Sequence, residues 1–186
     1  MTNRRAFIAT AAAALSAPSL ALSGQVPADI NPRFKAQIVP IKRNFAAGEV
    51  HVTPWNHYLY FTLGHGQAIR YGVAVGAEGR TFSGVAVIGR KAEWPRWTPT
   101  ASMIEREPDK YAKYANGMDG GPNNPLGARA LYLYQSGQDT LFRIHGTPQP
   151  WTIGQSVSSG CIRMVNAHVE HLYKKVPVGA TVRVYA

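Results

Sequence analysis

The chain has 186 residues, 45% of them apolar, and a single cysteine, which favours one domain large enough to bury its own core. The formal charge is +10, but the basic residues form only short runs without the motifs of nucleic-acid-binding folds, so the sequence argues against a nucleic-acid partner. A lone cysteine excludes an intrachain disulfide and argues against a cysteine-based metal cluster.

The N-terminus combines positive charge with a short apolar run. Arg4 and Arg5 precede an Ala-rich segment that Pro18 interrupts, and this order is typical of a twin-arginine export signal. We expect residues 1–23 to be a signal peptide cut after Ser23; the alternative is a disordered tail. The run is too short to span a bilayer comfortably. These features predict a periplasmic protein without stable membrane insertion after signal removal.

Residues 24–45 contain three prolines and few periodic apolar positions, and they are expected to form a linker or an extended wrap. Residues 46–186 are expected to form the domain, and from residue 50 onward the chain is rich in β-branched and aromatic residues. A three-residue hairpin loop, Gly64–Gly66, is predicted between the first two of the strands, which are expected at 57–63, 67–71, 85–88, 130–134, 141–144 and 181–185.

Two segments between the strands stand out. Residues 91–127 are rich in proline, glycine and tryptophan and predict a long, ordered loop with one short helix near 103–107. Residues 166–176 predict a helix with Asn166 as its N-cap, an apolar face at helical spacing, and an end at Pro177.

A histidine and the cysteine each come directly after a predicted structural element, a strand in one case and a tight turn in the other. The expected strand at 141–144 leads into His145, and Gly160 permits a tight turn before Cys161. Cysteine catalysis needs a thiolate, a base within hydrogen-bond reach and donors for the oxyanion. His145 could be the base, and the backbone N–H groups from Ser159 to Cys161 the donors. An imidazolium beside the sulfur would lower the thiol pKa. The alternative is a buried cysteine that acts as a small apolar residue.

Two motifs in this region resemble a known family. His145-Gly146-Thr147 followed by the run 158–164, Ser-Ser-Gly-Cys-Ile-Arg-Met, resembles the signature of the L,D-transpeptidase catalytic domain, the YkuD-like family. Segments around Arg90-Lys91, around Trp94-Pro95 and at 124–127 are similar to the branch that contains ErfK, YbiS, YcfS and YnhG. The resemblance extends over residues 46–186.

The resemblance implies a mainly β, sandwich-like fold with one or two short helices, one of them after Cys161. It implies a two-step acyl transfer without a cofactor, in which peptidoglycan stem peptides are donor and acceptor. Cys161 would be the nucleophile and His145 the base, with the Gly146 carbonyl orienting the ring. Supporting or oxyanion roles would fall to Gly146 and to the turn residues Ser158, Ser159 and Gly160.

The sequence departs from many family members at two positions. Ser159 stands where many have a second histidine, and serine cannot carry a proton near neutral pH, so His145 is expected to be the base. Arg163 stands where some have asparagine; it would bind a substrate carboxylate or form a structural ion pair. Trp151 would line the substrate groove or serve packing.

No metal site is predicted, because His51, His57 and His65 show no zinc-ligand spacing. His168 and His171 are expected on an exposed helix face. Within the same chemistry, water as acceptor would make an L,D-carboxypeptidase, and a protein amine would make an enzyme that anchors proteins to peptidoglycan. A non-catalytic wall-binding module is the alternative from another class.

Overall fold

The computed structural model describes residues 26–27, 30–77, 80 and 82–186; the predicted signal peptide lies outside these residues. Nine strands form one sheet in the order β1-β4-β3-β2-β11-β6-β7-β8-β10, and β5 and β9 form a second, two-stranded sheet. The strands are β1 (Gln37–Pro40), β2 (Val50–Thr53), β3 (Tyr58–Gly64), β4 (Gln67–Gly72), β5 (Val75–Gly76), β6 (Gly84–Glu93), β7 (Arg129–Gln135), β8 (Gln138–His145), β9 (Ser156–Ser158), β10 (Ile162–Arg163) and β11 (Thr181–Val184).

The helices are short. The described residues contain the α-helices α1 (Ala101–Arg106), α2 (Pro108–Tyr111) and α3 (Asn166–Lys175), and the 3₁₀ helices η2 (Pro32–Phe34), η3 (Pro54–Asn56), η4 (Ala112–Tyr114) and η5 (Pro150–Thr152). The predicted fold class, mainly β with a helix after Cys161, is confirmed. The described part has three α-helices rather than one or two, because the 91–127 excursion contains α1 and α2.

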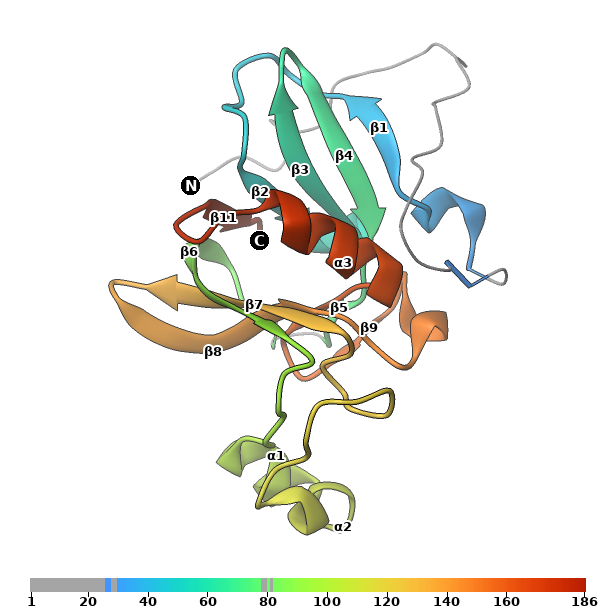
Figure 1. The fold of residues 1–186 in the computed structure, drawn as a ribbon, viewed down its shortest axis with the longest axis vertical. Coiled ribbons are helices and arrows are strands. Elements are labelled where there is room, and N and C mark those ends of the chain that lie inside the picture. Colours follow the sequence, from blue (N-terminus) through green and yellow to red (C-terminus); the bar gives the residue numbers. More distant parts are fainter. Residues whose placement is uncertain (1–25, 28–29, 78–79, 81) are drawn as a thin grey trace.

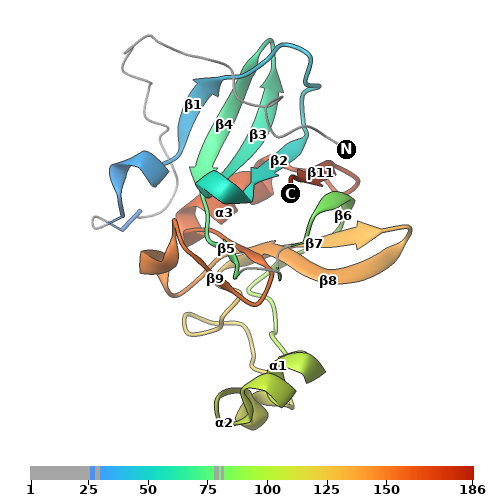
Figure 2. The same cartoon turned by 180° about the vertical axis from the view of Figure 1, so that it is seen from behind.

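The large sheet bends so that its two ends form different layers. In Figures 1 and 2, β1, β4, β3 and β2 stand at a steep angle to β6, β7 and β8, and α3 lies between the two groups. The core fills this angle with fully buried side chains from both groups and from α3, among them Leu59, Tyr71, Ile88, Leu133 and Leu172. The excursion with α1 and α2 lies on the other side of β6, β7 and β8 (Figure 1).

The N-terminal segment predicted as a linker or extended wrap contributes to the sheet. β1 pairs antiparallel with β4, with Gln37 opposite Arg70 and Pro40 opposite Gln67. Phe34 of η2 is buried in a small second apolar cluster with Ile153 and Ala167. This segment therefore covers one edge of the domain as an extended strand.

The β3–β4 hairpin differs from the prediction in its loop. Gly64 still belongs to β3 and pairs with Gln67, so the loop has two residues, His65 and Gly66, and not three. Both have positive φ, 52° and 77°. Two-residue loops with positive φ at both positions match the right-handed twist of the paired strands, which explains why this loop is shorter than expected.

The start of α3 also corrects a prediction. The N-cap is Val165, without a side-chain capping bond, and Asn166 is the first helical residue. The Oδ1 atom of Asn166 instead accepts hydrogen bonds from the backbone N–H groups of Ala128 (3.1 Å) and Thr147 (3.2 Å). Asn166 therefore joins two loops rather than capping its own helix.

The prediction that His168 is exposed is wrong. Its side chain is completely buried on the inner face of α3, with its ring centroid 5.7 Å from that of Tyr71. Within the described part of the chain, neither ring nitrogen has a hydrogen-bond partner. Burial, followed by the positive charge of His171, lowers the pKa of His168 to about 4. The ring therefore packs as a neutral group.

Replacing His168 with phenylalanine is expected to stabilise the protein, because it removes two buried polar atoms without partners at a cost of about 1–3 kcal/mol. Between pH 6.5 and about 4 the unfolded chain binds a proton at His168 that the folded chain does not, so stability falls as the pH falls through this range. Urea unfolding at pH 8 and pH 5 should show a larger gain from His168→Phe at pH 5. An equal gain at both values would contradict this assignment.

Candidate active site

The two predicted reactive side chains lie on one face of the sheet. β10 runs parallel to β8, with Ile162 beside Ile144 and Arg163 beside His145. Successive side chains of a strand point to opposite faces, so the two isoleucines enter the core and His145 and Arg163 face the other way. The Met164 N–H donates to the His145 carbonyl at 2.8 Å and extends this pairing.

Cys161 comes directly before β10, and the same register places it beside Arg143 on the face that carries His145. Cys161 and His145 are thus diagonal neighbours across this parallel pair of strands. The sheet pairing therefore brings together two residues that lie 16 positions apart in the sequence.

Cys161 and His145 both line a cavity of about 560 Å³. The excursion forms one wall, and the loop after His145 together with the β9 turn forms the other. The lining residues include Arg80, Trp97, Met103, Glu107, Lys110, Tyr111, Leu126, Thr147, Gln149, Trp151, Ser158, Ser159 and Arg163. The cavity is large enough for a short peptide segment.

The His145 ring is held by the chain that follows it. Its Nδ1 donates to the Gly146 carbonyl oxygen at 2.5 Å, which is the contact that the family resemblance implies. This bond leaves Nε2 as the unprotonated nitrogen. Burial, followed by the charge of Arg163, lowers the pKa of His145 to about 3, although the Gly146 bond acts in the opposite direction. The imidazole is therefore neutral at neutral pH and able to accept a proton.

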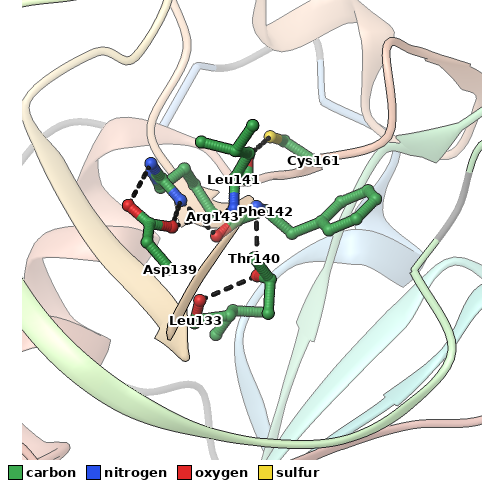
Figure 3. Close-up of polar contacts among 7 residues, drawn as sticks. All are labelled: Leu133, Asp139, Thr140, Leu141, Phe142, Arg143 and Cys161. Atoms are coloured by element: carbon green, nitrogen blue, oxygen red, sulfur yellow. Dashed lines mark hydrogen bonds and ion pairs between the residues drawn. The ribbon is translucent and has the colours of Figure 1, made fainter. Parts of the chain in front are cut away.

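The Cys161 thiol is half-buried and donates to the Leu141 carbonyl oxygen, with Sγ 3.9 Å from that oxygen (Figure 3). Burial raises the pKa of the thiol, opposed by a backbone hydrogen bond from Arg143 and by the charges of Arg143 and Arg163. The prediction of an imidazolium beside an ionised sulfur is wrong for the resting site, because burial disfavours both charged forms. The resting pair is a neutral thiol and a neutral imidazole.

The Ser158 hydroxyl holds the turn before Cys161 by two hydrogen bonds. Its Oγ donates to the Cys161 carbonyl at 2.6 Å and accepts from the Gly160 N–H at 3.1 Å. The Gly160 amide, expected among the oxyanion donors, is thus already engaged. The amides of Ser159 and Cys161 make no hydrogen bond within the described residues and remain available as donors.

Gly160 has a φ of +130°, and a Cβ atom there would lie 2.6 Å from the Arg80 carbonyl oxygen and 2.6 Å from the Phe142 ring. No larger residue fits this turn without moving the backbone. The glycine therefore allows the Cys161 turn to pack directly against β8.

The other predicted residues also line the cavity. The Ser159 hydroxyl lies 3.4 Å from a guanidinium nitrogen of Arg106. Arg163 forms no ion pair with any described residue, so the alternative of a structural ion pair is not supported. Trp151 is 64% exposed at the cavity rim, which excludes the packing role.

Four residues that position the site were not predicted. Asn166 tethers the loop after His145, Leu141 accepts the thiol hydrogen bond, and Arg143 with Asp139 forms an ion pair beside Cys161. The expected strand at 141–144 contained Arg143, two residues before the histidine, but nothing in the pattern indicates the irregular backbone that presents the Leu141 carbonyl.

The chain matches the family model of the L,D-transpeptidase catalytic domain, YkuD, over residues 48–184. A putative L,D-transpeptidase encoded in the ATP synthase subunits region of Fuscovulum blasticum is 30% identical, with 98% of this chain and 97% of that protein covered. The probable L,D-transpeptidase ErfK/SrfK of Escherichia coli is 37% identical over 118 residues, which cover 60% of this chain and 35% of that protein. The chain thus spans about a third of the length of this relative.

Solved structures share the fold. A Brucella melitensis protein described as a probable carnitine operon oxidoreductase is 51% identical, with a TM-score of 0.58 and coverage of 81% of this chain and 92% of that chain. L,D-transpeptidase 3 of Mycobacterium tuberculosis, bound to a faropenem-derived adduct, is 16% identical, with a TM-score of 0.54 and coverage of 74% and 59%. The fold and the site together define a mainly β domain that places a cysteine and a histidine in one cavity. The chain belongs to the L,D-transpeptidase catalytic domain family.

None of the helices in the described residues is both long and apolar enough to cross a bilayer. No three histidine, cysteine, aspartate or glutamate side chains among the same residues are grouped closely enough to hold a metal ion.

Proposed function

We propose that this protein is an exported cysteine acyltransferase that joins peptidoglycan stem peptides by 3→3 cross-links. The observation that carries the proposal is the placement of Cys161 and His145 on one sheet face, in one cavity, within a domain of the L,D-transpeptidase family. The export signal predicted at residues 1–23 supports a periplasmic location. Cell fractionation that finds the protein in the cytoplasm would contradict that location.

In the first step, Nε2 of His145 accepts the proton of the Cys161 thiol, and the sulfur attacks the carbonyl carbon of the third stem residue, a diamino acid. The Ser159 and Cys161 amides, which make no hydrogen bond to any described residue, would donate to the resulting oxyanion. The carbon–nitrogen bond to the terminal D-Ala then breaks. The leaving amine takes the proton from His145, and an acyl-enzyme thioester remains.

In the second step, the side-chain amine of another stem attacks the thioester carbonyl, and His145 removes a proton from this amine. The carbon–sulfur bond breaks, the proton returns to the sulfur, and the new amide links the two stems. The positive side chains Arg80, Lys110 and Arg163 in the cavity wall suit a substrate that carries several carboxylates.

Incubation with purified disaccharide-tetrapeptide, followed by mass spectrometry, tests the proposal. Transfer predicts release of D-Ala together with a cross-linked dimer. Release with tripeptide alone would indicate an L,D-carboxypeptidase, and transfer only to an added protein amine would indicate an anchoring enzyme. Cys161→Ala is expected to abolish every product, since it removes the nucleophile. Binding without turnover by the unmodified protein would indicate a wall-binding module.

A further inference from the structure

β8 contains an irregularity directly beside the candidate nucleophile. Tyr132 of β7 pairs with Arg143 of β8, but Tyr134 pairs with Asp139, so β8 has two more residues than β7 between these pairs. Leu141, in the extra stretch, has a φ of +62°. Such bulges often redirect groups next to active sites, and this one presents the Leu141 carbonyl oxygen to the Cys161 sulfur.

Two side chains hold the bulge in place (Figure 3). The Asp139 carboxylate accepts the Leu141 N–H at 2.8 Å. The Thr140 hydroxyl donates to the Leu133 carbonyl at 2.7 Å and accepts the Phe142 N–H at 3.2 Å. The backbone at this point is therefore defined by hydrogen bonds.

The Arg143 guanidinium is held by three groups: a carboxylate, a backbone carbonyl and an aromatic ring. Its Nη1 and Nη2 donate to the two carboxylate oxygens of Asp139 at 2.6 and 2.8 Å, and Nη1 also donates to the Phe142 carbonyl at 2.9 Å. Its guanidinium carbon lies 4.2 Å from the centroid of the Tyr132 ring. Only 13% of the side chain is exposed. A guanidinium with these partners has a definite position.

Arg143 belongs to a row of residues that crosses four strands toward the sulfur. Arg90 of β6 pairs with Tyr132, and Tyr132 pairs with Arg143. The β8–β10 register then places Cys161 beside Arg143. The Arg90 guanidinium carbon lies 3.6 Å from the Tyr132 ring centroid, so Tyr132 contacts both guanidiniums. Within the row, Arg143 is the cation next to the nucleophile.

We propose that Arg143, held by Asp139 and Tyr132, is a positioning residue whose charge favours the anionic form of the Cys161 sulfur during proton transfer to His145. This inference rests on the proposed function, in which Cys161 is the nucleophile. The register makes the action selective, because Arg143 lies beside Cys161 whereas Arg163 lies beside His145. A positive charge nearer to the sulfur than to the imidazole stabilises the thiolate more than it destabilises the imidazolium.

The causes of the pKa shifts agree with this arrangement. The charge of Arg143 lowers the Cys161 pKa ahead of that of Arg163, and Arg163 acts on the His145 pKa ahead of Arg143. The Asp139 carboxylate raises the thiol pKa, but by less than either arginine lowers it. Loss of the Arg143 charge should therefore raise the pKa of the thiol further. Loosening the bulge would instead weaken the contact with the Leu141 carbonyl, which accepts from the protonated thiol, so it would not raise the thiol pKa.

The pH dependence of alkylation by iodoacetamide tests the proposal without any peptidoglycan. Arg143→Gln removes the charge and keeps a side chain that can hydrogen-bond to Asp139. It is expected to move the alkylation midpoint to higher pH and to slow alkylation at pH 7 by roughly tenfold, since the thiolate is the reactive form. Arg143→Lys keeps the charge and is expected to retain most of the wild-type rate.

Thr140→Val is the matched control, because it removes both hydrogen bonds of the Thr140 hydroxyl without changing any charge. It is expected not to move the alkylation midpoint to higher pH. An unchanged midpoint in a folded Arg143→Gln protein would overturn the proposal, and so would an equal shift in Thr140→Val. If Arg143→Gln does not fold, a midpoint for Arg143→Lys well above that of the folded wild-type protein would also overturn it. A shifted midpoint in an enzyme that never releases D-Ala would refute the proposed function and leave this inference standing.

Discussion

Replacing His145 with glutamine is expected to lower kcat/KM for a tetrapeptide stem by about 10²–10⁴-fold, the usual contribution of a positioned base. The thiol depends on this base because burial raises its pKa, so little thiolate forms without a proton acceptor. Glutamine is similar in size and can donate to the Gly146 carbonyl, but it cannot accept a proton. The measurement is D-Ala release under conditions where substrate is well below KM.

The pH profile of the wild-type protein gives an independent check on the same ring. With the pKa of His145 at about 3, the imidazole stays neutral from pH 8 down to pH 5, so kcat/KM should show no acidic limb near pH 6.5 from this group. An acidic limb near 6.5 that disappears in the glutamine variant would contradict the neutral resting pair. His65→Asn, at the tip of the exposed β3–β4 loop, is the control and should match the wild type.

Asn166→Ala is expected to cost about 2–4 kcal/mol of unfolding free energy, because it leaves the Ala128 and Thr147 N–H groups without their acceptor. Activity should also fall, since Thr147 follows the Gly146 carbonyl that holds the His145 ring. A Cβ atom at Gly146 would lie 2.2 Å from Oδ1 of Asn166, which shows how closely the loop approaches this side chain. Urea unfolding and D-Ala release measure the two effects.

Asn166→Asp tests whether the acceptor oxygen of Asn166, and not its amide nitrogen, is what the two loops require. Aspartate has the same shape, keeps an acceptor oxygen and is favoured in the first turn of a helix. It is expected to lose less stability than the alanine variant and to retain more activity. If the aspartate and alanine variants were equally damaged, the tether between the two loops would not be the reason for the loss.

The candidate site could be predicted from the sequence because its residues lie within two short motifs that resemble the family signature. The glycine before Cys161 and the strand pattern before His145 are local signals, and the family motif depends on them. The β-rich character followed in the same way from β-branched and aromatic runs, since these side chains pack well on a pleated sheet. The sequence left open whether Arg163 binds a substrate carboxylate or forms an ion pair, and whether Trp151 lines the groove or serves packing. Both choices depend on what surrounds these side chains.

The sequence alone therefore determined the fold class and singled out Cys161 and His145 as the candidate reactive pair. The tertiary structure decided their electrostatic state, because burial at the cavity depends on the excursion and on neighbouring strands that lie far away in the chain. It also decided the bulge at Leu141, the tether made by Asn166 and the burial of His168. Each of these depends on a partner strand or loop that local patterns do not specify, since a side chain's free energy is set by what packs against it.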